Sequence, residues 1–261
     1  MKIIYAIIML IFSFNLSAIS GQFDTVVIVS IDALHPAAVT EVNCPNIFKY
    51  IKNGLYISEG KSTTPPKTLV AHTSMVTGLT PEQNGKIDNV WKKGDKKVEK
   101  PTVFLSAKKA GYKTAFIYSK PKLGYLADSY VDYEKYSRDN AIEEAVKFLG
   151  TSEKQFVFLH ISGLDIVGPE SGWMSKEYIE EFNFIDEMLG YLFKKLDSGN
   201  SYLLVITSDH AGHDKIHGSN HKEDFKRPII IYSSKEKITN LNYDVRPIEN
   251  LKIVVEDLYL K

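Results

Sequence analysis

The sequence predicts an α/β protein with an open, mostly parallel central sheet and helices on both faces. Two observations lead to this prediction: runs rich in β-branched and aromatic residues that are apolar along their whole length, and helical patterns between them. Strands buried on both faces of a sheet have such runs, and their alternation with helices is typical of parallel sheets. The predicted strands are 24–31, 113–118, 155–162, 202–208 and 228–232.

The predicted helices are bounded by prolines and glycines. Proline is tolerated at the first helical position, and glycine commonly follows the last turn. We therefore expect helices to start at Pro45 and Pro101, and to end before Gly111 and Gly150. The predicted helices are 45–53, 101–110, 139–149 and 175–196, the last with an apolar stripe typical of core packing.

Composition limits the class of protein. The chain has 261 residues, 44% hydrophobic and 25% charged, so we expect a single domain over residues 21–261. Its formal net charge of zero argues against a nucleic-acid-binding protein, because such proteins neutralise phosphates with Lys and Arg. The lone Cys44 cannot form a disulfide within the chain. Stability is therefore expected to come from the core, from bound metal, or from both.

The N-terminal segment has the pattern of a secretory signal peptide. Lys2 precedes an apolar run over 3–14, and small residues occur at Ala18 and Ser20. The run is shorter than the ~20 residues that a membrane span needs, so a retained anchor is the less favoured alternative. We expect residues 1–20 to be removed, with no stable membrane span afterwards, and the mature protein to be periplasmic or secreted.

Acidic residues and a histidine follow three of the predicted strands. Asp32 follows the first, Asp165 follows 155–162, and Asp209 with His210 follows 202–208. Because ligands bind at the carboxyl ends of strands in such sheets, we expect these side chains to meet. Carboxylates with imidazole suit zinc. Taken alone, each Asp could instead be a helix cap.

Three later histidines are spaced four residues apart: His213, His217 and His221. On a helix this spacing would align them on one face, but Gly212 and Gly218 favour a loop. Each is therefore assessed separately, with a surface histidine as the alternative to a metal ligand.

Thr68 lies where a proline-rich loop runs into a helix that ends at Gly78. A hydroxyl at a helix N-terminus has backbone amides and the positive end of the helix dipole beside it, which favours a phosphoryl group. The alternative is that Thr68 is only the N-cap.

Two further segments are expected at the surface. The lysine-rich segment 91–100 is interpreted as a solvated loop rather than a binding patch, and 119–138 as a small lid over the site. Lys120 and Lys122, in the second segment, face either solvent or a substrate phosphate, and solvent is favoured.

In this order, the segments resemble the type I phosphodiesterase/nucleotide pyrophosphatase family of the alkaline-phosphatase superfamily. The resemblance implies an alkaline-phosphatase-like fold with a small or minimal cap. It extends from Val26 to about Tyr232, and parts of it, such as Gly172-Trp173-Met174-Ser175, look like bacterial members. It depends on four matches: the strand ending in Asp32, the Pro66-Lys67-Thr68 loop with His72 and Val76-Thr77-Gly78, the segment Gly85-Lys86-Ile87-Asp88-Asn89, and Ser208-Asp209-His210.

The resemblance implies a role for each matched residue. Thr68 is the expected nucleophile, and Asn89 donates a hydrogen bond to a phosphoryl oxygen. A first metal ion is held by Asp32, Thr68, Asp209 and His210, and a second by Asp165 and a later histidine. His217 is the first choice for that histidine and His213 the alternative. The implied cofactor is zinc, one or two ions, with manganese as another possibility.

Two positions depart from the family pattern, and the smaller departure is Ala211, where the family commonly has glycine. The family has Asp-Xaa-Xaa-Gly-His after the third strand, whereas this chain has Pro169 in the histidine position. Proline has no side-chain donor atom, so the second metal site loses a ligand unless His160, Glu170 or His213 replaces it. Two hypotheses follow: a metal-dependent phosphoester hydrolase, and a pseudoenzyme or phosphate-ligand binding protein.

The substrate is expected to be a small phosphoester, and nucleotides, lipid headgroups and sugar phosphates all stay open. The oligomeric state is not predicted. A serine hydrolase is disfavoured because the Gly-Xaa-Ser-Xaa-Gly motif is missing. Sulfate-ester hydrolysis is disfavoured because Thr68 stands where that chemistry needs cysteine or serine.

Overall fold

Seven strands form one sheet in the order β2-β7-β6-β1-β5-β3-β4. The structure is a computed structural model that describes residues 22–260, so the predicted signal peptide lies outside the described residues. The strands are β1 Thr25–Ile31, β2 Leu55–Lys61, β3 Lys113–Tyr118, β4 Tyr133–Tyr136, β5 Gln155–Ile161, β6 Tyr202–Thr207 and β7 Lys226–Ser233.

The sheet is mostly parallel, as predicted. Strand β1 lies at its centre and pairs in parallel with β5 and β6, and β3 pairs in parallel with β5 and β4. Strand β7 runs antiparallel to both of its neighbours, β6 and β2. The carboxyl ends of β1, β5 and β6 therefore meet at one edge of the sheet.

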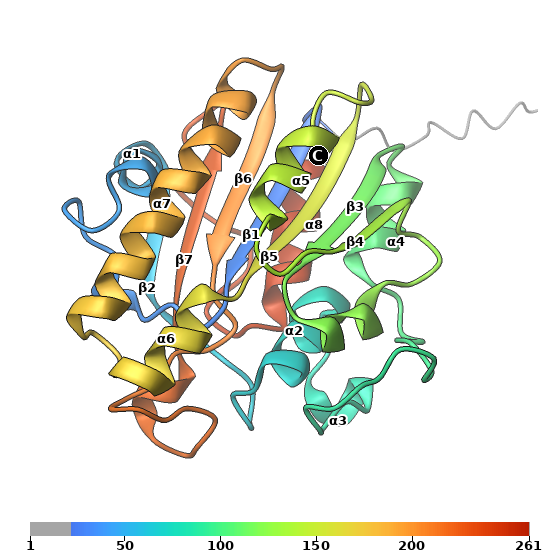
Figure 1. Cartoon of the computed structure of the whole chain (residues 1–261). Coiled ribbons are helices and arrows are strands. Elements are labelled where there is room, and N and C mark those ends of the chain that lie inside the picture. The colour runs from blue at the N-terminus through green and yellow to red at the C-terminus, as the bar shows by residue number, and fades with distance from the viewer. Residues whose placement is uncertain (1–21, 261) are drawn as a thin grey trace, which may run out of the picture.

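Helices cover both faces of the sheet (Figure 1). Within β1, Val27, Val29 and Ile31 pack into one core and Val26 and Ile28 into the other, which explains the continuous apolar run. The first core includes α1 Pro45–Asn53, α5 Ala141–Phe148, α6 Gly163–Ser171 and α7 Lys176–Asp197, and the second includes α2 Thr68–Thr77, α4 Val103–Lys109 and α8 Asn250–Tyr259.

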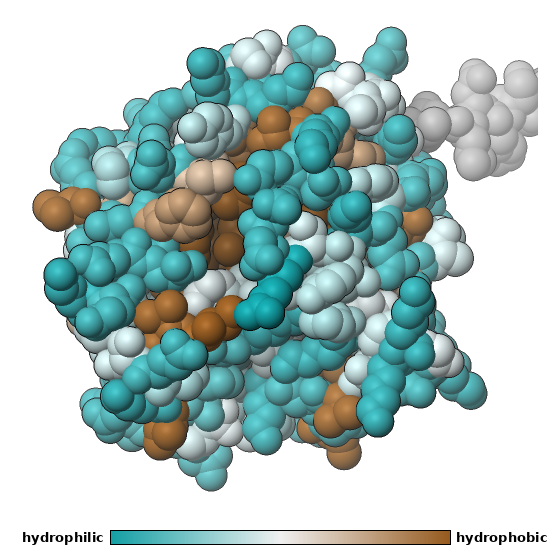
Figure 2. Space-filling view, in the orientation of Figure 1, coloured by the Kyte–Doolittle hydropathy of each residue, from teal (hydrophilic) through white to brown (hydrophobic). Residues whose placement is uncertain are grey.

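Four short helices occur in the loops: α3 Pro81–Asn84 and the 3-10 turns η1 Pro36–Ala38, η2 Pro121–Leu126 and η3 Lys222–Phe225. Figure 2 shows the face with α5 and α7, where apolar atoms interrupt a largely hydrophilic surface. A hollow of about 390 Å³ lies there, lined in part by Ile142, Ile166, Phe184 and Met188. Within residues 22–260, no helix combines the length and apolar character that crossing a bilayer requires.

Two sequence-based expectations are wrong. The segment 119–138 is not a separate lid, because it forms η2 and then β4, the edge strand of the sheet. The fourth helix starts at Val103 and not at Pro101, because the Thr102 side chain caps it by accepting a hydrogen bond from the Phe104 amide (3.2 Å). Cys44 is buried with a free thiol, directly before α1.

Candidate active site

The acidic residues predicted at the strand ends meet at the carboxyl edge of the sheet. Asp32 directly follows β1, Asp165 lies in the first turn of α6 after β5, and Asp209 and His210 follow β6. Asp32, Asp209 and His210 have no solvent-exposed surface. Because β1 lies between β5 and β6, the topology itself brings these groups together.

Two side chains, those of His160 and Lys120, contact the same carboxylate oxygen of Asp32. Its Oδ2 accepts a hydrogen bond from His160 Nε2 (2.9 Å) and lies 2.6 Å from Lys120 Nζ. Burial by itself raises the pKa of Asp32, but Lys120 and His160 hold that pKa well below its usual range. Asp32 is therefore a carboxylate, with its Oδ1 turned toward His210 Nε2 at 3.4 Å.

The turn after Asp32 contains a residue with a left-handed backbone conformation, which three hydrogen bonds stabilise. Ala33 has a φ of 64°, a left-handed conformation that costs an alanine free energy. Its carbonyl oxygen accepts hydrogen bonds from Tyr178 Oη (2.7 Å) and Trp173 Nε1 (3.2 Å), and its amide donates to Asp209 Oδ1 (3.2 Å). The tyrosine and tryptophan thus position the Asp32 turn.

His210 is oriented as a metal-binding histidine would be. Its Nδ1 donates to the carbonyl of Ala211 (2.9 Å), which leaves the Nε2 lone pair directed at Asp32 Oδ1 and Asp209 Oδ2, both 3.4 Å away. Metal-binding histidines usually donate their second ring N–H in this way. Burial lowers the pKa of His210, but Asp209, Asp32 and Asp165 raise it above the ordinary value.

These three residues fit a metal ion. Buried polar atoms are normally hydrogen-bonded, yet Asp32 Oδ1, Asp209 Oδ2 and His210 Nε2 have no hydrogen-bond partner among the described residues. The same residues offer ligand atoms that lie within 4.8 Å of one another. A divalent cation would satisfy all three atoms at once, and carboxylate and imidazole ligands suit zinc.

Thr68 is the first residue of α2 and is 1% exposed. Lys67 occupies the N-cap position, so the alternative that Thr68 is only the cap is wrong. The Thr68 hydroxyl accepts a hydrogen bond from Lys120 Nζ (3.2 Å). One turn later, His72 Nδ1 donates to the Thr68 carbonyl (2.8 Å) and lies 3.5 Å from Asp209 Oδ2. Thr68 therefore borders the aspartate cluster.

Asn89 is placed beside the start of the same helix. Its Oδ1 accepts a hydrogen bond from the Leu69 amide (2.9 Å), so its amide nitrogen stays available as a donor. Lys86 holds this loop through Asp88 Oδ1 (3.1 Å) and the Val90 carbonyl (2.7 Å). The segment 85–89 therefore positions a donor next to Thr68.

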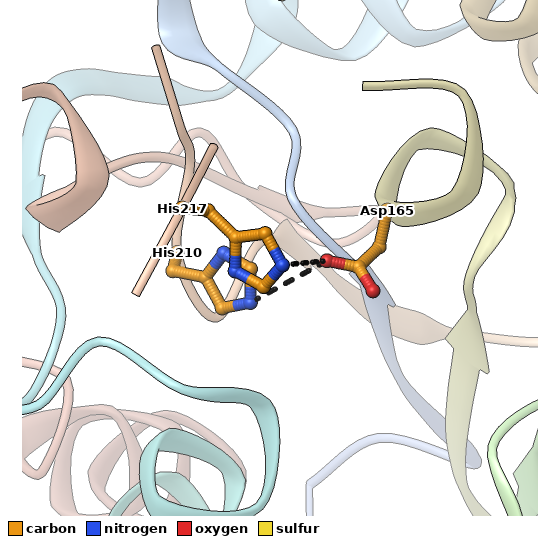
Figure 3. Close-up of side chains that lie close together, drawn as sticks. All are labelled: Asp165, His210 and His217. Carbon is orange, nitrogen blue, oxygen red and sulfur yellow. Dashed lines mark ion pairs between the residues drawn. The ribbon is translucent and has the colours of Figure 1, made fainter. Parts of the chain in front are cut away.

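Asp165 and His217 form the second part of the cluster. Figure 3 shows the Asp165 carboxylate pointing at both imidazoles, with Oδ1 3.2 Å from His217 Nε2 and 3.9 Å from His210 Nε2. The two rings stack at 4.6 Å with an interplanar angle of 6°. Burial and the charge of Asp32 raise the pKa of Asp165, and burial lowers the pKa of His217.

The possible replacements for the missing histidine lie elsewhere. Pro169 is inside α6, one turn after Asp165. His213 donates to Asp224 Oδ1 (2.7 Å) and stacks on His221, so the structure places His217 and not His213 beside Asp165. His160 is turned to Asp32, and Glu170 is exposed.

Lys120 is the site residue that sequence reasoning misjudged. It was expected to be solvated, but its side chain is 16% exposed and its ammonium contacts Asp32, Asp165 and Thr68. Burial alone lowers the pKa of Lys120, but Asp32 and Asp165 raise it above the ordinary lysine value. Its position two residues after β3 is a strand-end signal in the sequence, but the neighbours of Lys120 follow only from the order of the strands in the sheet.

Comparison with solved structures supports the fold. A 2-O GAG sulfatase matches with a TM-score of 0.70 and 14% identity, over 91% of this chain and 70% of that one. The C-terminal periplasmic domain of EptC from Escherichia coli, in complex with zinc, matches with a TM-score of 0.68 and 13% identity, over 92% and 83%. These likenesses show the alkaline-phosphatase-like fold.

Comparison of sequences identifies the family. The human ectonucleotide pyrophosphatase/phosphodiesterase family member 1 is 26% identical over 199 residues, which are 64% of this chain and 21% of that protein. The matched regions span only 10% to 23% of the length of the curated relatives. The family model for type I phosphodiesterase/nucleotide pyrophosphatase matches residues 26–246. The chain therefore belongs to the type I phosphodiesterase/nucleotide pyrophosphatase family.

Proposed function

We propose that this protein is a metal-dependent phosphoester hydrolase of the phosphodiesterase/pyrophosphatase type, with Thr68 as its nucleophile. One observation carries the proposal: the unpartnered atoms of Asp32, Asp209 and His210 lie together, and Lys120 Nζ contacts both Asp32 and the hydroxyl of Thr68. Family membership supports the reaction class. We propose zinc as the metal, held by Asp32, Asp209, His210 and Thr68, with manganese as the alternative.

In the first step, Thr68 Oγ attacks phosphorus after its proton has passed to solvent. A new P–Oγ bond forms, the bond from phosphorus to the leaving oxygen breaks, and that oxygen takes the electron pair and a proton from water. A divalent cation, when bound, lowers the pKa of the Thr68 hydroxyl and balances the charge of the phosphoryl group. The product of this step is a phosphothreonine at Thr68.

In the second step, water attacks the phosphorus of the phosphothreonine. The P–Oγ bond breaks, and Thr68 recovers its electron pair and a proton from solvent. The Asn89 amide donates to a non-bridging phosphoryl oxygen in both steps, because its own oxygen is already engaged by the Leu69 amide. The N-terminus of α2 adds the favourable end of the helix dipole.

The substrate we propose is a small phosphoester. The mouse ectonucleotide pyrophosphatase/phosphodiesterase 5, a structural neighbour, is described in complex with AMP as an inactive variant, which makes nucleotides the first class to screen. We further propose that the chain is exported, with residues 1–20 as its signal peptide. Their Lys2 and apolar run support this.

The alternative of a phosphate-binding protein without turnover has less support. Its motivation is Pro169, which affects only the part of the site around Asp165 and His217. The position of Thr68, the free amide nitrogen of Asn89 and the three unpartnered ligand atoms support turnover instead.

The test is hydrolysis of a chromogenic phosphodiester by the full chain with added zinc or manganese. Replacing Thr68 with alanine should lower turnover by at least about 10³-fold, because alanine has no hydroxyl to accept the phosphoryl group. Acid-quenched wild-type protein should carry phosphate on Thr68, detected by mass spectrometry. The matched control is Thr239→Ala, at an exposed threonine, which should keep full turnover. Equal activity of Thr68→Ala and wild type would show that the nucleophile is misassigned.

A further inference from the structure

A lysine ammonium lies at the centre of the candidate site, between the carboxylates that follow β1 and β5. Lys120 Nζ is 2.6 Å from Asp32 Oδ2, contacts Asp165 Oδ2, and donates to Thr68 Oγ at 3.2 Å. Its side chain is only 16% exposed. Because this largely buried ammonium contacts three oxygens of the candidate site, Lys120 is itself part of that site.

Lys120 divides the oxygens of the two aspartates into two sets. Both Oδ2 atoms face the ammonium, while both Oδ1 atoms face the imidazoles of His210 and His217. Two buried carboxylates this close repel each other unless a positive charge lies between them. In this structure the positive charge between them is the Lys120 ammonium.

The ligand set does not fit two zinc ions. Among the described residues around Thr68, two groups of three ligands can be drawn, Asp32-Asp209-His210 and Asp165-His210-His217, and His210 belongs to both. Its Nε2 can bind only one ion, and it is closer to Asp32 and Asp209 (3.4 Å each) than to Asp165 (3.9 Å). Asp165 and His217 are then left as two ligands where a catalytic zinc ordinarily has three from the protein.

Pro169 cannot serve as the third ligand beside Asp165 and His217. It lies one helical turn after Asp165 in α6, and it offers no side-chain atom that could bind a metal. Position 169 therefore offers no ligand, while Lys120 places a cation between the two aspartates.

We propose that Lys120 replaces the second metal ion, so that the active site works with one divalent cation and one fixed ammonium. This inference rests on the proposed function. In the reaction, Lys120 Nζ hydrogen-bonds Thr68 Oγ and a non-bridging oxygen of the phosphoryl group, and offsets the charge that builds up there. It transfers no proton. Lys120 is accordingly a catalytic residue, and Asp165 positions it.

The first test counts metal ions and needs no activity. The full chain is equilibrated with zinc, dialysed, and analysed for zinc per chain by mass spectrometry of the metal. The wild type should bind one zinc. The double variant Lys120→Met/Pro169→His should bind two, because it removes the ammonium and restores the missing ligand. A second zinc that binds the wild type and is lost in His217→Ala would overturn the proposal. A zinc lost in His213→Ala belongs to the separate group of His213, His221 and Asp224 and leaves it standing.

The second test compares lysines in one segment. Lys120→Met should lower kcat by about 10²–10³-fold, the loss typical of one charge-stabilising donor, while still binding one zinc. Lys120→Arg should recover part of that loss. Lys135→Met, at an exposed position of β4 in the same segment, should stay within about twofold of the wild type.

The two tests separate this proposal from the function it rests on. Unchanged kcat in Lys120→Met would overturn the role of Lys120 while leaving the hydrolase proposal intact. A wild type that binds one zinc but hydrolyses no phosphoester would contradict the hydrolase function, while the one-metal composition would stand. If Lys120→Met does not fold, the zinc count of the wild type and the kcat of Lys120→Arg still decide the question.

Discussion

His160 is a buried histidine whose two ring nitrogens have different tasks. Its Nε2 donates to Asp32 Oδ2 (2.9 Å), and its Nδ1 lies 3.0 Å from the Ser119 hydroxyl. The second oxygen of Asp32 is then turned toward the unpartnered Nε2 of His210. His160 is therefore a positioning residue that acts through Asp32.

We predict that His160→Phe weakens zinc binding by about 10- to 100-fold, the usual effect of losing a hydrogen bond to a metal ligand. Phenylalanine keeps the ring volume but cannot donate to Asp32. His160→Gln, whose amide nitrogen can reach the same carboxylate, should restore most of the affinity. Zinc dissociation constants from competition with a chromogenic chelator provide the measurement.

An exposed histidine serves as the control for this pair. His221→Phe should leave the zinc dissociation constant at the catalytic site unchanged, because His221 stacks on His213 and does not contact Asp32. Loss of zinc affinity in His160→Phe without recovery in His160→Gln would mean that ring packing, and not the hydrogen bond, positions Asp32.

Some residues of the candidate site could be predicted from the sequence and others could not. The six predicted metal-site residues lie close together in the structure. Five of them follow a predicted strand or begin a predicted helix, which the sequence pattern shows, whereas His217 was implied only by the family resemblance. His160 was weighed only as a substitute ligand, because it lies inside β5 and gives no strand-end signal. Lys120 was judged by type, and lysines are mostly exposed. Only the three-dimensional structure shows what surrounds it.

At the scale of elements, α1 depends on a residue in the middle of α7. The side chain of Cys44, the N-cap residue of α1, accepts no capping hydrogen bond from the helix. Asp186 provides the missing acceptor: its Oδ1 accepts from the Ile47 amide (2.8 Å) and its Oδ2 from the Asn46 amide (3.0 Å). A buried carboxylate at a helix N-terminus also interacts favourably with the helix dipole. Asp186 therefore joins two helices of the first core.

We predict that Asp186→Ala lowers the free energy of unfolding by about 2–3 kcal/mol, because it leaves one buried and one partly buried amide donor of α1 without acceptors. Glu187→Ala is the matched control: the same helix loses a carboxylate of the next, exposed residue, and stability should change by less than about 0.5 kcal/mol. Urea unfolding of both variants measures the difference. Equal stability of the two variants would show that Asp186 is not a significant cap.

The elements that could be predicted from the sequence are more deeply buried and more uniformly apolar than those that could not. Strands β1, β3, β5 and β6 are buried along almost their whole length, so their apolar runs are unmistakable. Strand β2 is half exposed and carries polar residues, and α6 contains two glycines and a proline. Neither has a clear hydrophobic period. Both owe their structure to the neighbours they pack against.

At the scale of the whole molecule, the metal ligands connect distant parts of the chain. Asp32 and Asp209 are 177 positions apart and lie at the ends of neighbouring strands, with Asp209 Oδ1 already tied to the Ala33 amide. A cation bound there would cross-link the centre of the sheet. Since it binds the folded state and not the unfolded chain, it should stabilise the fold by mass action.

We predict that saturating zinc raises the free energy of unfolding, by about 2.7 kcal/mol at a free concentration 100-fold above the dissociation constant, and that this gain grows with pH. In the metal-free protein, Asp209, Asp32 and Asp165 raise the pKa of His210 above its ordinary value. Protonated His210 stabilises the metal-free fold fully below the unfolded pKa of about 6.5, and this contribution is lost as pH rises through the higher folded pKa. Zinc requires the unprotonated imidazole and has the opposite pH dependence. Thermal unfolding with zinc and with chelator should therefore diverge as the pH rises above about 6.5. Asp209→Asn, which weakens the ligand set, should shrink the difference at every pH. A zinc effect that stays constant as the pH rises would mean that His210 does not compete with its proton for the metal.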